Sequence, residues 1–138
     1  MNMQNAFQNL NWLAIITAGA SAFVLGGLWY SPLLFAKRWM KETGITEETT
    51  RNANMTRIFG LGFLLSLMAA FFLAMFIGHS AGAGFGALAG FMAGLGWVFT
   101  FMGISYLFES RTLVHFLINS IYSILSLTIM GLIIGAWQ

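Results

Sequence analysis

The ten charged side chains of this 138-residue chain are confined to two short segments, and this confinement limits the fold more than any other feature. Eight of them lie between Lys37 and Arg57, and the other two are Glu109 and Arg111. The stretches 1–36, 58–108 and 112–138 are uncharged and rich in Leu, Ile, Phe, Ala, Gly and Met. An apolar run of more than about 18 residues is long enough to span a bilayer as a helix. The sequence therefore predicts an all-α integral membrane protein.

Composition excludes several other classes of protein. Only 7% of the residues are charged, against about 25% in soluble domains. The absence of cysteine excludes disulfides and thiolate metal sites. The net charge of +2 does not indicate binding to nucleic acid, because the basic residues flank predicted spans, where anionic lipid headgroups are the expected counter-ions. The lipid bilayer is thus the predicted partner, and residues 1–9 lack the basic residues of a cleaved signal peptide.

Turn-forming residues divide the apolar stretches into four transmembrane helices in one domain, 1–138. Ser31-Pro32 ends the first, because proline lacks an amide donor and restricts the residue before it. The uncharged run 58–108 is too long for one crossing of a hydrocarbon core of about 30 Å, so it must turn once, at 78–82. A second turn, 109–112, precedes the last helix. The predicted spans are about 10–30, 57–78, 84–108 and 113–136.

The long loop, 31–55, is predicted to be amphipathic. Its first half interleaves apolar and basic residues, a pattern typical of a short helix lying in the membrane interface. These residues are Leu33, Leu34, Phe35, Lys37, Arg38, Trp39, Met40 and Lys41. Gly44 is expected to end that helix, and Thr46 to cap a second one with Glu47 and Glu48 in its first turn. A solvated connector without helices is the alternative.

The six Lys and Arg residues all fall on one predicted side of the membrane. The other side, formed by the N-terminus, the turn 78–83 and the C-terminus, carries none. Because cytoplasmic loops are enriched in Lys and Arg, the loop 31–55 is predicted to be cytoplasmic and both termini to face outward.

Gly82, Gly86, Gly90 and Gly94 recur every four residues on the third span and form one stripe along a helix. Such a stripe lets another backbone approach closely, which is how membrane helices gain packing contacts. We expect the stripe to pack against a helix of this chain or of another copy. A path for a gas or an ion along the stripe is the alternative.

The fourth span carries a polar seam of His115, Asn119, Tyr122 and Ser126, and Arg111 begins the same stripe. Spacings of four, three and four residues place the seam on one helix face. Lipid cannot satisfy polar groups, so the seam is expected to face the bundle interior or a cavity. One hypothesis is hydrogen bonding to neighbouring helices, and the other is a ligand or proton site in which His115 titrates near neutrality.

Two further segments lie at the level where the seam begins. Glu109 is expected to pair with Arg111 or Arg57, or alternatively to exchange a proton with His115. Tyr30 ends the first span on the same side, where Ser31-Pro32 frees backbone carbonyls. The predicted pocket residues are Tyr30, Glu109, Arg111, His115, Asn119, Tyr122 and Ser126.

The run Trp29-Tyr30-Ser31-Pro32-Leu33-Leu34-Phe35, with Trp39 and Gly44-Ile45-Thr46-Glu47-Glu48 after it, resembles domain-of-unknown-function family 1761. Asn119, Tyr122, Gly131 and Trp137 also look like the closing helix of that family. The resemblance implies a small four-helix protein of the bacterial inner membrane and no established activity.

Signatures of enzymes and metal sites are absent from the sequence. It contains no Asp, two His and four Glu, and neither H-E-x-x-H nor G-x-S-x-G occurs. Neither a metal nor a cofactor is therefore predicted. The leading hypothesis is a homo-oligomer whose polar seam lines a pocket or pathway for a small solute or lipid, since one four-helix chain has little room for a pathway of its own. A structural or accessory protein without a ligand is the alternative, and a membrane enzyme is the third hypothesis.

The predicted orientation can be tested with reporter fusions. Because the Lys and Arg residues favour the cytoplasm, alkaline phosphatase fused to the C-terminus should be active outside the cytoplasm. Activity of a cytoplasmic reporter at the same position would reverse the orientation.

Overall fold

The computed structural model describes residues 2–137, which form helices and turns without any strand. Four helical segments are long and apolar enough to cross a membrane: Trp12–Trp29, Met55–Ile77, Gly82–Phe108 and Leu113–Ala136. The predicted all-α fold with four such helices is confirmed. The first, second and fourth segments are α2, α5 and α8, and the third comprises α6 (Gly82–Ala93), η1 (Gly94–Phe99) and α7 (Thr100–Phe108).

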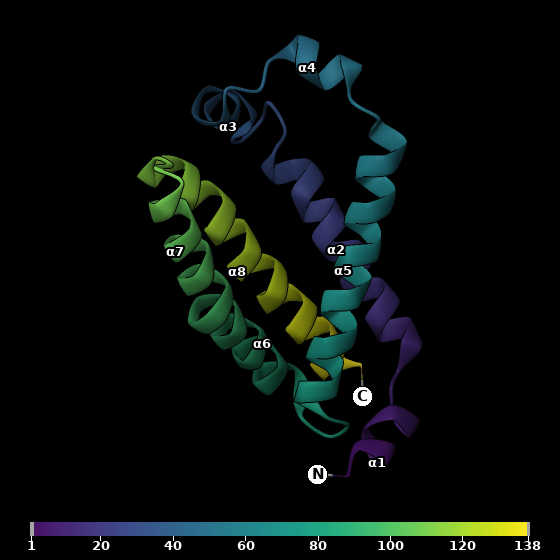
Figure 1. Ribbon diagram of the computed structural model, residues 1–138. Helices are drawn as coiled ribbons and strands as arrows, with labels where there is room; N and C mark the ends of the chain where they lie inside the picture. Colours follow the sequence, from purple (N-terminus) through teal and green to yellow (C-terminus); the bar gives the residue numbers. More distant parts are fainter. Residues whose placement is uncertain (1, 138) are drawn as a thin grey trace.

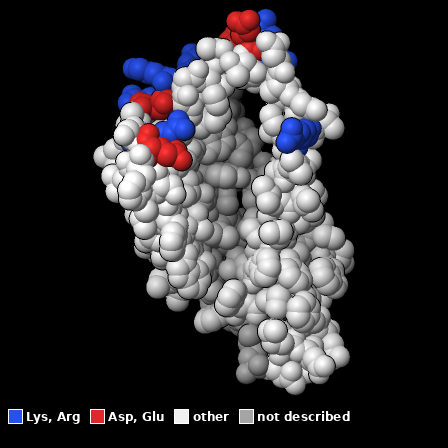
Figure 2. Space-filling view, in the orientation of Figure 1, with Lys and Arg blue, Asp and Glu red and all other residues white. Residues whose placement is uncertain are grey.

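The four long helices run alternately up and down between two chemically different ends (Figure 1). One end holds α3 (Ala36–Thr43), α4 (Glu47–Asn52) and the turn between α7 and α8, and Figure 2 shows the charged side chains gathered there. We call this the charged end. Helix α1 (Met3–Gln8), which precedes α2, and the last turn of α8 lie at the opposite, uncharged end.

Asparagine and threonine side chains define where three of the long helices begin. Asn11, Asn54 and Thr112 precede α2, α5 and α8, and each accepts a hydrogen bond of 3.1 Å from the backbone N–H three residues later. Such a cap satisfies one of the amide groups that a helix start leaves unpaired. In addition, Asn11 donates to the carbonyl of Trp137 at 2.8 Å, which joins the first long helix to the end of the last.

The loop between α2 and α5 contains two short helices. Gly44 follows α3 in the left-handed conformation, with φ of 75°, which a residue without a side chain adopts at little cost. Thr46 accepts from the N–H of Thr49 at the start of α4, and Glu47 and Glu48 occupy its first turn.

Two helical features were not anticipated from the sequence. The first is α1, which Asn2 caps by accepting from the N–H of Gln4. The second is η1, a π-helical segment inside the third span. The hydroxyl of Thr100, directly after η1, hydrogen-bonds the carbonyls of Gly96 and Trp97, both at 2.9 Å, in the widened turns.

The hydrophobic core is concentrated toward the uncharged end. It consists of Ile15, Ala18 and Ala22 of α2, Ala70, Leu73, Ala74 and Ile77 of α5, and Met130 and Ile134 of α8. Several of these are alanines, which let membrane helices approach closely. The first half of α5 contributes no residue to this core, and many of its large apolar side chains are exposed. Toward the charged end, α5 is therefore free to face lipid or another chain.

The glycine stripe packs against α8 of the same chain. A Cβ placed on Gly86 or Gly90 would collide with the carbonyl oxygen of Gly131 or Leu127, respectively. A Cβ on Gly94 would lie 2.8 Å from Cα of Ile124. Gly82 has φ of +77° and no neighbour within 4 Å of an added Cβ, so its lack of a side chain serves the turn, while its carbonyl group packs against Gly135 of α8. The close approach of the third span to α8 thus depends on Gly86, Gly90 and Gly94, and on Gly131 and Gly135 of α8.

Two alanine substitutions on α6 test this contact. In Gly90→Ala, the new methyl group must displace the α8 backbone, so we expect a loss of about 1–3 kcal/mol in stability. Gly84→Ala is the matched control, because its Cβ meets nothing within 4 Å and alanine favours the helix by up to about 1 kcal/mol. Thermal unfolding in one detergent measures both, and equal melting temperatures would contradict the packing.

Candidate functional site

An open groove of about 450 Å³ lies near the charged end, lined by residues from α3, α7, α8 and the end of α2. We call it the tyrosine groove, because three of its lining side chains are tyrosines. Its residues are Tyr30, Trp39, Met102, Tyr106, Asn119, Tyr122 and Ser123.

Asn119 joins two of these tyrosines from different helices. The hydroxyl of Tyr30 donates to Asn119 Oδ1 at 2.7 Å, and Asn119 Nδ2 donates to the hydroxyl of Tyr106 at 2.8 Å. Tyr30 follows α2 and Tyr106 belongs to α7, so the carboxamide links three of the long helical segments. A partly buried side-chain network of this kind helps to fix the positions of its members.

Aromatic rings form the walls of the groove. The ring centroid of Tyr30 lies 5.4 Å from that of Trp39 and 5.4 Å from that of Tyr122, both in edge-to-face geometry. The hydroxyl of Tyr122 donates to the carbonyl of Ala22 at 2.8 Å, and that of Ser123 donates to the carbonyl of Asn119 at 3.1 Å. The groove thus has aromatic walls around one polar carboxamide.

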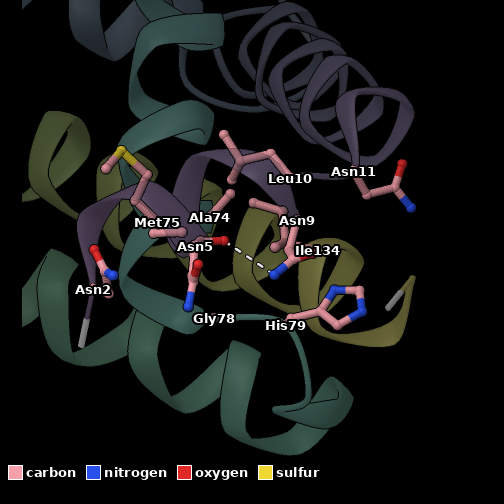
Figure 3. Close-up of a pocket in the computed structure, with 11 residues that line it drawn as sticks. Asn2, Asn5, Asn9, Leu10, Asn11, Ala74, Met75, Gly78, His79 and Ile134 are labelled. Carbon is pink, nitrogen blue, oxygen red and sulfur yellow. Dashed lines mark hydrogen bonds between the residues drawn. The ribbon is translucent and has the colours of Figure 1, made fainter.

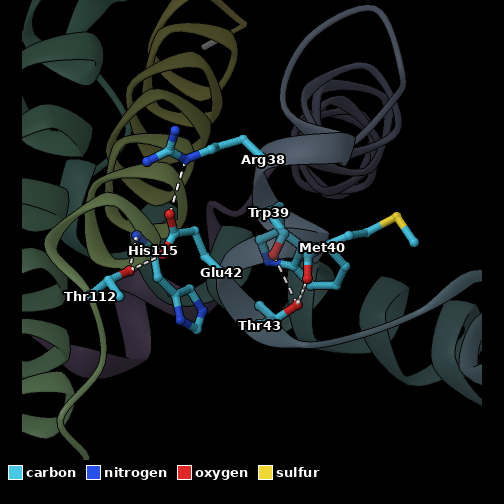
Figure 4. Close-up of polar contacts among 7 residues, drawn as sticks. All are labelled: Arg38, Trp39, Met40, Glu42, Thr43, Thr112 and His115. Carbon is cyan, nitrogen blue, oxygen red and sulfur yellow. Dashed lines mark hydrogen bonds and ion pairs between the residues drawn. The ribbon is translucent and has the colours of Figure 1, made fainter.

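Glu42 fastens α3, and with it Trp39, to the start of α8 (Figure 4). Its carboxylate accepts from the Thr112 hydroxyl at 2.5 Å and from Arg38 Nε at 3.0 Å. The hydrogen bond from Thr112, reinforced by the charge of Arg38, outweighs desolvation and lowers the pKa of Glu42 below its ordinary value of 4.5. The carboxylate also lies beside the positive end of the α8 dipole, which favours its ionised form.

Of the seven predicted pocket residues, three line the tyrosine groove: Tyr30, Asn119 and Tyr122. His115 and Ser126 are buried at 6% and 5% exposure, and His115 Nδ1 and Ser126 Oγ have no hydrogen-bond partner among residues 2–137. The His115 ring packs 5.0 Å from that of Tyr106, between ring centroids, but does not line the groove. The seam is therefore divided between a groove and a closed interior.

Glu109 and Arg111 pair with each other at the turn before α8. Arg111 Nε lies 3.1 Å from Glu109 Oε2, and both side chains are exposed. Arg111 borders a separate pocket of about 220 Å³ together with Tyr106 and Thr112. The pair lies outside the tyrosine groove.

Four groove residues were not selected from the sequence: Trp39, Met102, Tyr106 and Ser123. The sequence does contain a pattern that points to Tyr106. Gly103-Ile104-Ser105-Tyr106 ends the third span in much the same way as Gly27-Leu28-Trp29-Tyr30 ends the first. Trp39 and Met102 look like ordinary interface and core residues, and only the helix packing reveals that they share a wall.

A second pocket, of about 270 Å³, lies at the uncharged end (Figure 3). Asn2, Asn5, Asn9, Asn11 and His79 supply its polar side chains. Asn9 donates to the carbonyl of Asn5 at 3.0 Å. Because Asn9 and Asn11 each bond a backbone carbonyl, we assign these amides to closing that end of the bundle. Among residues 2–137, no group of three or more His, Cys, Asp or Glu is placed to hold a metal ion.

Comparison with known proteins identifies the family. The family model described as "Protein of unknown function (DUF1761)" matches residues 13–135. The chain belongs to this family. No curated protein and no solved structure matches it. Since the DUF1761 description assigns no activity, the function of this member has to be inferred from its own side chains.

The contact between Glu42 and Thr112 predicts how the docking of α3 depends on pH. Because the pKa of Glu42 is lower in the docked state than its ordinary value of 4.5, the ionised carboxylate stabilises docking fully at pH values above 4.5. This contribution is lost as the pH falls through the lowered pKa of the docked state. Hydrogen exchange should therefore show constant protection factors for α3 from neutral pH down to about 4.5, with loosening below it.

Glu42→Gln should loosen α3 already at neutral pH, because the charged acceptor is gone. The matched control is Glu47→Gln, since Glu47 makes only an exposed contact of 3.8 Å with Arg51. Unchanged protection of α3 in Glu42→Gln would contradict the role of this carboxylate.

Proposed function

We propose that this DUF1761 member is a multi-pass protein of the bacterial inner membrane that binds a lipid or a small lipid-like solute in the tyrosine groove. The observation that carries the proposal is the Tyr30–Asn119–Tyr106 network, a polar group held within an open aromatic groove. Binding sites for small molecules commonly combine mostly apolar walls with a few placed polar groups.

The orientation is part of the proposal, with the charged end in the cytoplasm and both termini outside. The Lys and Arg side chains lie at the charged end, which supports this assignment through the positive-inside rule (Figure 2). Trp29 and Trp39 then mark the inner interface, and Trp12 and Trp137 mark the outer one, as interfacial aromatic residues do.

The depth of the groove favours an amphiphile. Asn119 is six residues after Leu113 and so lies about 9 Å along α8 from its start. With the charged end at the cytoplasmic face, as proposed, this level lies close to the boundary between headgroups and acyl chains, where amphipathic groups are accommodated. A molecule with one polar group and an apolar tail fits a groove that is polar at Asn119 and otherwise lined by rings and Met102.

A homo-oligomer is the second part of the proposal. The half of α5 nearest the charged end adds nothing to the core, and Ile58, Phe59, Leu61 and Leu65 are each at least half exposed. A second copy could cover this face, and packing of several chains would provide the room for a pathway that four helices lack. A structural role without a ligand is the competing hypothesis, and it is favoured by the closed surroundings of His115 and Ser126.

Two tryptophan truncations test the binding site. Trp39→Ala removes a wall of the groove, whereas Trp97→Ala removes a side chain that is 63% exposed and outside it. Native mass spectrometry from mild detergent should detect a retained amphiphile in the wild type and in Trp97→Ala, with most of it lost in Trp39→Ala. The same spectra report the number of chains.

Equal retention in Trp39→Ala and Trp97→Ala would contradict binding in the groove. A mass corresponding to one chain in every detergent would contradict the oligomer.

A further inference from the structure

We propose that the tyrosine groove selects the phosphate group of an anionic phospholipid. This inference rests on the proposed function and deepens it by naming the headgroup chemistry. It is carried by an excess of hydrogen-bond donors in the groove, by the charge of α3 and by the depth of the site.

The donor excess follows from counting hydrogens. The hydroxyls of Tyr30 and Tyr106 and the carboxamide of Asn119 together carry about four polar hydrogens. The two hydrogen bonds that join these residues use two of them. The other two, one tyrosine hydroxyl and one amide N–H, have no acceptor within residues 2–137. If the nitrogen and oxygen of the Asn119 carboxamide are exchanged, the unused hydroxyl hydrogen belongs to Tyr30 instead of Tyr106, but the number of unused donors stays at two.

The remaining hydroxyls of the groove do not offset this excess. Those of Tyr122 and Ser123 already donate to the backbone carbonyls of Ala22 and Asn119. The groove therefore presents two donors side by side, which suits a ligand rich in acceptors. Phosphate oxygens are such acceptors, and hydrogen bonds to a charged acceptor are the strong ones.

The net charge of α3, the helix that supplies Trp39, has the sign that a phosphate requires. Helix α3 contributes Trp39 to the groove and carries three cations, Lys37, Arg38 and Lys41, against one carboxylate, Glu42. Arg38 neutralises Glu42, so the two exposed lysines remain without an ion pair within residues 2–137. Aromatic rings alone would also suit an organic cation. Lys37 and Lys41 lie about 160° from Trp39 around α3, so they act on the groove through the field of the helix and not by contact, and that positive field disfavours a cation.

The surroundings of the donors favour a lipid over free phosphate. The walls are aromatic rings and Met102, which contact glycerol and acyl carbons well and inorganic phosphate poorly. In the proposed orientation the donors also lie close to the level where lipid headgroups meet the hydrocarbon. An anionic phospholipid can therefore place its phosphate at Asn119 while its chains remain in the bilayer.

Delipidated full-length protein should be titrated with lipids that share the same acyl chains but differ at the phosphate. Native mass spectrometry would compare phosphatidylglycerol with diacylglycerol, with inorganic phosphate as a competitor. We expect phosphatidylglycerol to bind at least about tenfold more tightly than diacylglycerol, equivalent to about 1.4 kcal/mol. Inorganic phosphate at equal concentration should not displace it.

Asn119→Asp tests the donors directly, because a carboxylate accepts from both tyrosines and leaves no donor unused. The variant should lose at least about tenfold in phosphatidylglycerol affinity while its diacylglycerol affinity changes by less than about twofold. Asn52→Asp on α4 is the matched control, since it introduces the same negative charge at an exposed position outside the groove, and its selectivity should equal that of the wild type.

Equal affinity of the wild type for phosphatidylglycerol and diacylglycerol would overturn the inference and leave the proposed function standing. Displacement by inorganic phosphate would overturn the choice of a lipid. Binding of neither lipid would remove the proposed function itself. If Asn119→Asp fails to fold, the wild-type comparison of the two lipids decides the question.

Discussion

The close backbone contact between α6 and α8 is the interaction on which the rest of this structure depends. Gly86, Gly90 and Gly94 bring the third span against α8 with no side chain between them. The continuation of that span, α7, then places Tyr106 beside Asn119. In a bilayer no hydrophobic force drives helices together, so small residues and polar contacts have to supply both affinity and register. The glycine contact and the groove are thus formed by the same two spans, at different positions along α8.

The attachment of α2 to α8 uses polar groups instead of glycines. Trp29 Nε1 donates to the carbonyl of Ile118 at 3.0 Å, and Tyr122 donates to that of Ala22. Glu42 then adds α3 from outside the span. The charged end is therefore held by a few directional contacts around an open groove, whereas the uncharged end is held by packed alanines and larger apolar residues. The proposed ligand site thus lies in the less tightly packed region, which suits the exchange of a ligand.

The sequence predicted the four spans because charges and turn residues mark their ends directly. It also predicted that His115, Asn119, Tyr122 and Ser126 share one face of α8, since that follows from helical spacing alone. Spacing along α8 does not reveal which other helix packs against each of these residues. In the structure, the tyrosines reach Asn119, while His115 and Ser126 are enclosed. The sequence did not predict the π-helical segment η1, because its residues show no distinctive hydrophobic period. Gly94, the first residue of η1, packs on Ile124 of α8.

The central claim is that Asn119 contacts the phosphate of a lipid, and solid-state NMR can observe this contact. The protein would carry ¹⁵N in its asparagine carboxamides and lie in bilayers containing phosphatidylglycerol. The account predicts dipolar dephasing of the Asn119 side-chain nitrogen by lipid ³¹P, which Asn119→Asp removes from the spectrum. Dephasing restricted to the lysine ammonium groups of α3 in a lysine-labelled sample, with none at Asn119, would contradict it.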